Sequence, residues 1–194
     1  MTLFLLGLIL ILLGFLHLLN EVAQVEPKLL QSIQQVSNSK PLLSFFREIW
    51  FIGRTPFTFI VLVFLIFINW KMGLIAGGVF LAIIGTEYLV KSLYHRKRPF
   101  TSDQAIAMLQ PIEPLDSSFP SGDALRVWYL ALILPAATGS ILQILVAAIS
   151  LAVLVTLGRL VMGVHYITDT LAGAGLGFIG AGTTIWLWNF LNIL

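Results

Sequence analysis

The sequence predicts an all-α, polytopic membrane protein built as a six-transmembrane-helix bundle. Of its 194 residues, 58% are hydrophobic and only 10% are charged, whereas an ordinary soluble domain is about a quarter charged. So few charged side chains do not make the polar surface that a soluble fold needs. The apolar runs are continuous rather than alternating, which favours helices with internally paired backbones over strands. The length suits a single domain, which we expect to cover residues 1–194.

Composition also narrows the classes of function. The chain has no cysteine, which excludes disulfides and thiolate metal sites. The pI of about 9.1 arises from a net charge of only +2, and no long basic run is present. A nucleic-acid partner is therefore not indicated.

Six apolar segments approach the length of about 20 residues that a helix needs to cross the hydrocarbon layer. They are residues 3–19, 55–70, 73–94, 122–138, 140–161 and 170–191. The first lacks a Lys/Arg-rich start and a small-residue cleavage site, so we expect a retained span rather than a signal peptide. In the last, Gly173 and Gly177 are spaced for close packing against another helix.

Three connections, residues 20–54, 95–121 and 158–169, carry nearly all the polar residues. With six spans they fall on the same side of the membrane, which predicts an active site at one membrane face. In the first connection, the stretch PLLSFFREIWFIG fits either an amphipathic helix in the membrane interface or a solvated connector.

The third polar connection carries a candidate nucleophile. His165 and Asp169 are four residues apart, so on a helix they share a face. A carboxylate that holds one imidazole nitrogen fixes the tautomer and leaves the other nitrogen free to attack. Arg159 precedes them, and its guanidinium matches phosphate oxygens. The alternative is a helix-end ion pair of Asp169 with either neighbour.

Candidate phosphate ligands lie at the two ends of the second polar connection, residues 95–121. Lys91 and Arg98 are seven residues apart, about two helical turns, so both can face one site. Their alternative role is to reach toward headgroups from a helix end, as we expect for the intervening Arg96.

The stretch PSGD begins the fourth apolar segment. Gly122 lets a bound group approach the backbone of a helix N-terminus, which attracts anions. Ser121 has the alternative role of helix N-cap. Together, these cations, N–H groups and the oriented histidine suit a phosphate whose phosphoryl group moves onto the histidine. No carboxylate cluster suggests a metal, so the cations would neutralise the developing charge and no cofactor is expected.

These residues resemble the type 2 phosphatidic acid phosphatase (PAP2) family of integral membrane lipid phosphatases. The family pattern is K-x6-RP, then PSGH, then SR-x5-H-x3-D. The matching residues here are Lys91, Arg98 and Pro99, then Pro120, Ser121, Gly122 and Asp123, then Gly158, Arg159, His165 and Asp169. The resemblance implies a metal-independent phosphatase in the bilayer, with a membrane lipid phosphate or diphosphate as substrate and no nucleic acid.

The resemblance also implies a role for each matching residue. His165 would be the nucleophile that forms a phosphohistidine, and Asp169 would orient it. The phosphate oxygens would be held by Lys91, Arg98, Arg159, Ser121 and Gly122. On the resemblance, the site would face the exterior of a plasma or inner membrane. The excess of Lys and Arg on the site's side would instead place it in the cytoplasm.

Two positions depart from the family pattern. Gly158 replaces a serine, and Asp123 replaces the histidine that protonates the leaving oxygen. Three readings of Asp123 stay open. It is a protonated acid or a headgroup contact in a phosphatase. Alternatively, a good leaving group needs no acid, which favours a polyprenyl diphosphate such as undecaprenyl diphosphate over phosphatidate. Or hydrolysis is lost, leaving a lipid phosphotransferase or a non-catalytic protein that binds anionic lipid.

Overall fold

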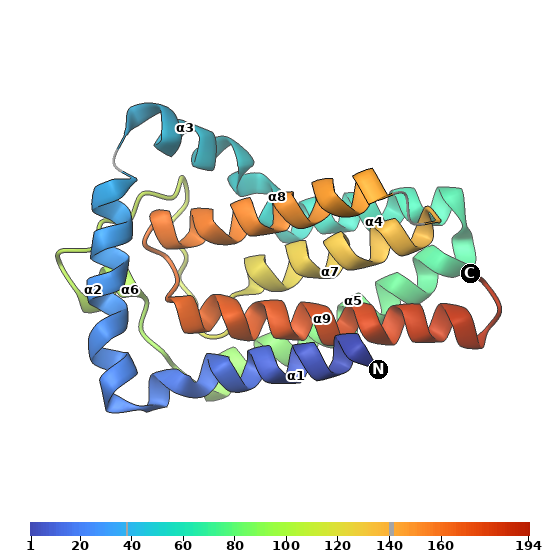
Figure 1. Ribbon diagram of the computed structural model, residues 1–194, viewed down its shortest axis with the longest axis horizontal. Coiled ribbons are helices and arrows are strands. Elements are labelled where there is room, and N and C mark those ends of the chain that lie inside the picture. The colour runs from blue at the N-terminus through green and yellow to red at the C-terminus, as the bar shows by residue number, and fades with distance from the viewer. Residues whose placement is uncertain (38, 140–141) are drawn as a thin grey trace.

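Long helices lie along the long axis of the molecule and form one bundle (Figure 1). The structure is a computed structural model that describes residues 1–37, 39–139 and 142–194, and all regular secondary structure in these ranges is helical. The bundle consists of α1 (Thr2–Gly14), α4 (Thr55–Ile68), α5 (Trp70–Leu93), α7 (Gly122–Ala137), α8 (Leu142–Val161) and α9 (Ile167–Phe190). The predicted all-α fold is confirmed.

The centre of the bundle is α9, which packs against α1, α5 and α7. A stripe of small residues makes this close packing possible. A Cβ atom on Gly177 would lie 2.6 Å from the carbonyl oxygen of Leu125 in α7. Gly173 faces the carbonyl of Ser121 in the same way. The predicted packing role of both glycines is therefore confirmed.

Among the described residues, fewer helices are long and apolar enough to cross a membrane than the six spans that the sequence predicts. Three helices, α5, α8 and α9, are long and apolar enough to cross a membrane, and two bent helix pairs raise this to as many as five. By contrast, α7 has 16 residues, short of the usual length of about 20. The count of six spans thus stays a prediction, and the predicted start of the fifth, residue 140, lies outside the described residues.

Two helices begin earlier than their hydropathy suggests, because polar residues cap them. The Oδ1 atom of Asn69 accepts a hydrogen bond from the N–H of Met72 at 3.3 Å, so α5 begins at Trp70 rather than at residue 73. Asp169 accepts from the N–H of Tyr166 at 2.8 Å, so α9 begins before residue 170.

The other helices cover one end of the bundle, where α2 crosses its axis (Figure 1). They are η1 (Phe15–Leu18), α2 (Asn20–Val36), α3 (Lys40–Ile49), η2 (Trp50–Gly53) and α6 (Pro99–Ser102). The chain turns by 96° between α1–η1 and α2. Leu30 of α2 is buried against Leu160 and Tyr166 at the bundle end. In α3, Phe46 is buried, so PLLSFFREIWFIG folds as amphipathic helix rather than as a solvated connector.

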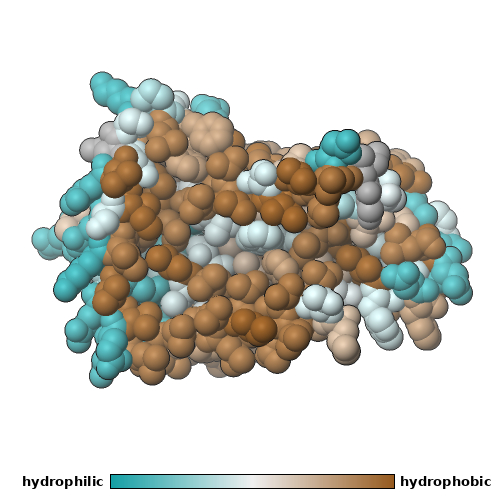
Figure 2. All heavy atoms as spheres, viewed as in Figure 1, coloured by the Kyte–Doolittle hydropathy of each residue, from teal (hydrophilic) through white to brown (hydrophobic). Residues whose placement is uncertain are grey.

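The surface reflects the same division. Hydrophobic side chains cover the middle of the molecule, and hydrophilic side chains gather at its two ends (Figure 2). Large apolar side chains in this middle region face outward, such as Phe64 and Tyr88, which are 65% and 75% exposed. Such a continuous apolar surface is stable in lipid rather than in water. The chain is an integral membrane protein.

Candidate active site

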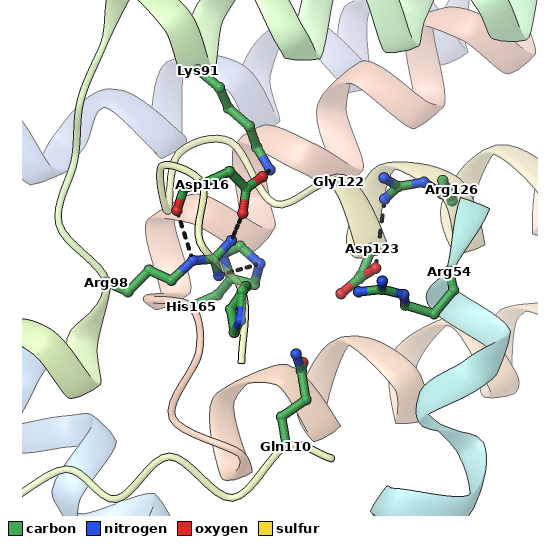
Figure 3. A pocket seen from close by; sticks show the side chains of 10 residues that line it. Arg54, Lys91, Arg98, Gln110, Asp116, Gly122, Asp123, Arg126 and His165 are labelled. Atoms are coloured by element: carbon green, nitrogen blue, oxygen red, sulfur yellow. Dashed lines mark hydrogen bonds and ion pairs between the residues drawn. The ribbon is translucent and has the colours of Figure 1, made fainter. Parts of the chain in front are cut away.

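A small polar cavity of about 60 Å³ lies at the end of the bundle that α2 crosses (Figure 3). The end of α5, the start of α7 and the loop between α8 and α9 meet there. The cavity is lined by Arg54, Lys91, Arg98, Gln110, Pro114, Asp116, Gly122, Asp123, Arg126 and His165. The three motifs of the sequence are thus brought to one place, although they are separated by up to 74 positions.

His165 lies in the loop before α9 and is only 2% exposed. Its Nε2 atom lies 3.3 Å from Nη1 of Arg98, which also donates to the carbonyl of Val164 at 2.8 Å. Its Nδ1 atom lies 3.7 Å from Oδ2 of Asp169, longer than a hydrogen bond. Burial lowers the pKa of His165, and the Arg98 guanidinium lowers it further. The imidazole is therefore neutral, and we assign the lone pair to Nε2, on the Arg98 side.

Asp169 lies behind the cavity wall and is held by several donors. Its Oδ2 atom accepts from the Ser118 hydroxyl at 2.5 Å and from the Tyr166 N–H at 2.8 Å. Its Oδ1 atom accepts from Arg96 at 2.6 Å. Arg96 also pairs with Glu26 of α2 at 2.7 Å. The expectation that Arg96 contacts headgroups is wrong, because its side chain is largely buried and bound to these two carboxylates.

Lys91 and Arg98 share a carboxylate that the sequence analysis missed. Asp116 lies 2.5 Å from Nζ of Lys91 and 2.6 Å from Nη2 of Arg98. Burial alone would raise the pKa of Asp116, but the two cations hold it well below its usual range. Asp116 is on a loop and its side chain is 52% exposed. Its carboxylate thus occupies the two cations expected to bind phosphate.

Asp123 is surrounded by arginines. It lies 3.4 Å from Nε of Arg159 and 3.5 Å from Nη1 of Arg126, which follows it by three residues in α7. Arg159 is fully buried, and its Nη2 atom donates to the carbonyl of Trp50 at 2.6 Å. Arg159 therefore lies behind Asp123 rather than on the cavity wall. A carboxylate paired in this way is ionised and is a poor proton donor.

The PSGD turn holds these groups in place. Ser121 accepts a hydrogen bond from the N–H of Ala124 at 3.3 Å, so its N-cap role is confirmed. Gly122 lines the cavity, and a Cβ atom there would clash with the carboxylate of Glu87. Glu87 pairs with Lys91 at 3.0 Å and with Arg126 at 3.6 Å. It thereby links the two sides of the cavity.

Arg54 is a second cavity residue that the sequence analysis did not single out. It precedes α4 and lies with its guanidinium 5.0 Å from the ring centre of Trp50. Charge alone is a weak signal for such a residue, because nothing in its local pattern relates it to positions about 70 residues later. Across the described residues, no group of three or more His, Asp or Glu side chains is placed to hold a metal ion.

Comparisons with known proteins agree with this arrangement. The sequence matches the PAP2 superfamily over residues 70–193, more than half of its length, and the chain belongs to this family. A comparison with curated proteins gave no match.

Two solved structures share the fold. The first transmembrane PAP2-type phosphatidylglycerolphosphate phosphatase from Bacillus subtilis aligns with a TM-score of 0.82 and 22% identity, over 96% of this chain and 95% of its own. LpxE from Aquifex aeolicus aligns with a TM-score of 0.75 and 23% identity, over 84% of this chain and 95% of its own. Such distant likeness establishes the fold, so function has to be argued from the site.

Proposed function

We propose that the protein, as one PAP2 domain over residues 1–194, is a metal-independent lipid phosphatase that works through a phosphohistidine on His165. The observation that carries the proposal is the position of Nε2 of His165. A buried, neutral imidazole presents this nitrogen beside Arg98, in a cavity lined by cations. Family membership and the two phosphatase structures of the same fold support the same reaction class.

The charges around the cavity suit an anionic, phosphorylated substrate. The cations Arg54, Lys91, Arg98, Arg126 and Arg159 outnumber the carboxylates Glu87, Asp116 and Asp123 by five to three, an excess of +2. A phosphate monoester carries a charge of about −1.5 to −2 at neutral pH. Its binding would therefore neutralise the site.

The proposed reaction has two steps. Lys91 and Arg98 bind the phosphoryl oxygens in place of Asp116, and Nε2 of His165 attacks phosphorus. An N–P bond forms while the bond from phosphorus to the leaving oxygen breaks, and the two cations stabilise the charge that develops. The leaving oxygen keeps the electron pair and, when it is an alkoxide, takes a proton from water. Water then attacks the phosphohistidine, which releases inorganic phosphate and the free imidazole. Asp169 fixes the loop that carries His165 and favours a proton on Nδ1.

The test is phosphate release by purified protein in detergent with EDTA, from phosphatidate and from a polyprenyl diphosphate. His165→Ala should lower the rate at least about 1000-fold, because the nucleophile is lost. His95→Ala, a change at an exposed histidine, is the matched control and should keep the rate. Brief incubation with ³²P-labelled substrate should leave acid-labile, base-stable label on the wild type alone. Equal rates for wild type and His165→Ala would contradict the proposal.

We propose, from the family resemblance, that the cavity opens to the exterior of the membrane. Leu115, 96% exposed on the loop beside the cavity, allows a direct test. Because the chain has no cysteine, Leu115→Cys creates a single labelling site. A membrane-impermeant maleimide should label it in intact cells. Labelling that requires permeabilised cells would place the cavity in the cytoplasm, as the distribution of Lys and Arg suggests.

A further inference from the structure

Arg126 has hydrogen-bonding capacity that the protein does not use. Its side chain is 13% exposed, and its ion pairs with Asp123 and Glu87, at 3.5 and 3.6 Å, are longer than a normal N–H···O bond. Its Nε atom is buried and has no hydrogen-bond partner among the described residues. Leaving buried donors unpaired is costly, so such a group points to a missing acceptor.

Arg54 is similarly uncommitted. No carboxylate of the described residues lies within 4.0 Å of its guanidinium, which stacks on Trp50. Arg54 and Arg126 lie on either side of Asp123 (Figure 3). Both also line an outer cavity of about 390 Å³ next to the small one. A group attached to a phosphoryl at His165 can extend past these two arginines into the outer cavity.

We propose that Arg54 and Arg126 form a second anion subsite, which binds the inner phosphate of a lipid diphosphate. The inference rests on the proposed function and names its substrate class. The terminal phosphate would bind at Lys91 and Arg98, and the inner phosphate would satisfy the free donors of Arg54 and Arg126. Asp123 would keep the two guanidinium groups apart and in place.

This subsite accounts for a reaction without a proton donor. When Nε2 of His165 attacks the terminal phosphorus, the bond from that phosphorus to the bridging oxygen breaks. The oxygen keeps the electron pair and leaves as part of a lipid monophosphate. The second pKa of such a phosphate is about 6, so it needs no proton at neutral pH. Arg54 and Arg126 stabilise its charge, which replaces the protonation that the ionised Asp123 does not perform.

The test compares two substrates that differ only by one phosphate, farnesyl diphosphate and farnesyl phosphate. Arg54→Gln should lower kcat/KM for the diphosphate at least about tenfold, because a charge-assisted hydrogen bond is lost. For the monophosphate the loss should stay below about threefold. Arg126→Gln should show the same selectivity, and Lys97→Gln, at an exposed position outside the cavity, should change neither. Equal losses for both substrates, or no loss, would overturn the subsite.

A binding experiment separates this inference from the proposed function. With His165→Ala as background, inorganic pyrophosphate should raise Tm more than orthophosphate does, and Arg54→Gln should remove the difference. If the wild type hydrolyses no lipid but pyrophosphate raises Tm in an Arg54-dependent way, the subsite is supported and the proposed phosphatase activity is contradicted. If hydrolysis depends on His165 but pyrophosphate has no Arg54-dependent advantage, the phosphatase stands and the subsite falls.

Discussion

The two halves of the cavity contain the same kinds of charge in different states. On the His165 side, Lys91 and Arg98 are satisfied by a close ion pair with Asp116. On the Asp123 side, Arg126 is held only by long ion pairs, and Arg54 by none among the described residues. The first half thus already holds an internal anion on an exposed loop. The second half, built around a fixed carboxylate, keeps donors free for a ligand. A phosphate must therefore displace Asp116 from the cations of the first half, whereas it can bind the cations of the second half without displacing a carboxylate.

The largest effect that separates the halves should come from Arg98→Gln. Arg98 contacts both Nε2 of His165 and the Val164 carbonyl, so its loss removes a phosphate ligand and loosens the nucleophile. We expect kcat/KM to fall at least about 100-fold for every substrate, a loss typical for one transition-state donor. Steady-state kinetics with both farnesyl substrates measures it. A loss confined to the diphosphate would mean that Arg98 binds the inner phosphate instead, which contradicts the assignment.

Asp123→Asn tests whether the second half is held together by ion pairs. Fully buried Arg159 would lose its counter-charge, and we expect a loss of about 3 kcal/mol in stability. Thermal unfolding in detergent would show a lower Tm, while the rate of the remaining folded protein falls less than about tenfold. Abolished activity at unchanged Tm would instead identify Asp123 as the proton donor.

Asp116→Asn should have a smaller and opposite effect. Without its carboxylate, the substrate no longer displaces an anion from Lys91 and Arg98. We expect KM and the inhibition constant of orthovanadate to fall about three- to tenfold, with kcat little changed. Glu48→Gln, at an exposed carboxylate of α3 outside both cavities, is the control. A higher KM would mean that Asp116 instead holds the two cations in position.

The smallest expected effect is a shift in pH dependence. The nucleophile acts as neutral imidazole, and burial and Arg98 both lower the pKa of His165. In the wild type, kcat/KM should therefore decline only below the ordinary value of about 6.5. In Arg98→Gln one of these causes is gone, so the acidic limb should move upward. Because titration of the substrate is common to both profiles, only their difference is interpreted. A downward shift would contradict the assignment.

The grouping of the motif residues could be predicted from the sequence because each motif lies where an apolar segment begins or ends. Lys91 lies in the last turn of α5, Ser121 caps α7, and Asp169 belongs to the capping box of α9, so each motif lies at an element boundary beside the cavity. Hydropathy predicted the bundle because residues that contact lipid or the core are apolar, so each long helix is an apolar run in the sequence.

The misses have a different physical origin. Asp116 and Arg54 come from irregular segments, and their place in the cavity depends on tertiary packing rather than on local periodicity. Arg96 looked like a headgroup contact because its charge is visible in the sequence, whereas its burial against Asp169 and Glu26 is not. Ion-pair partners in particular are chosen among segments that only the folded chain brings together.

The helix that crosses the bundle end limits how far the protein can be shortened. Glu26 of α2 accepts from Arg96 and from the N–H of Thr168, one residue before Asp169. A fragment trimmed to the matched region, residues 70–193, would retain every motif side chain yet lose this brace and Arg54. The loop that carries His165 would then lack its outer support. A shortened version of this protein must therefore keep its N-terminal third, although that part lies outside the region that matches the family.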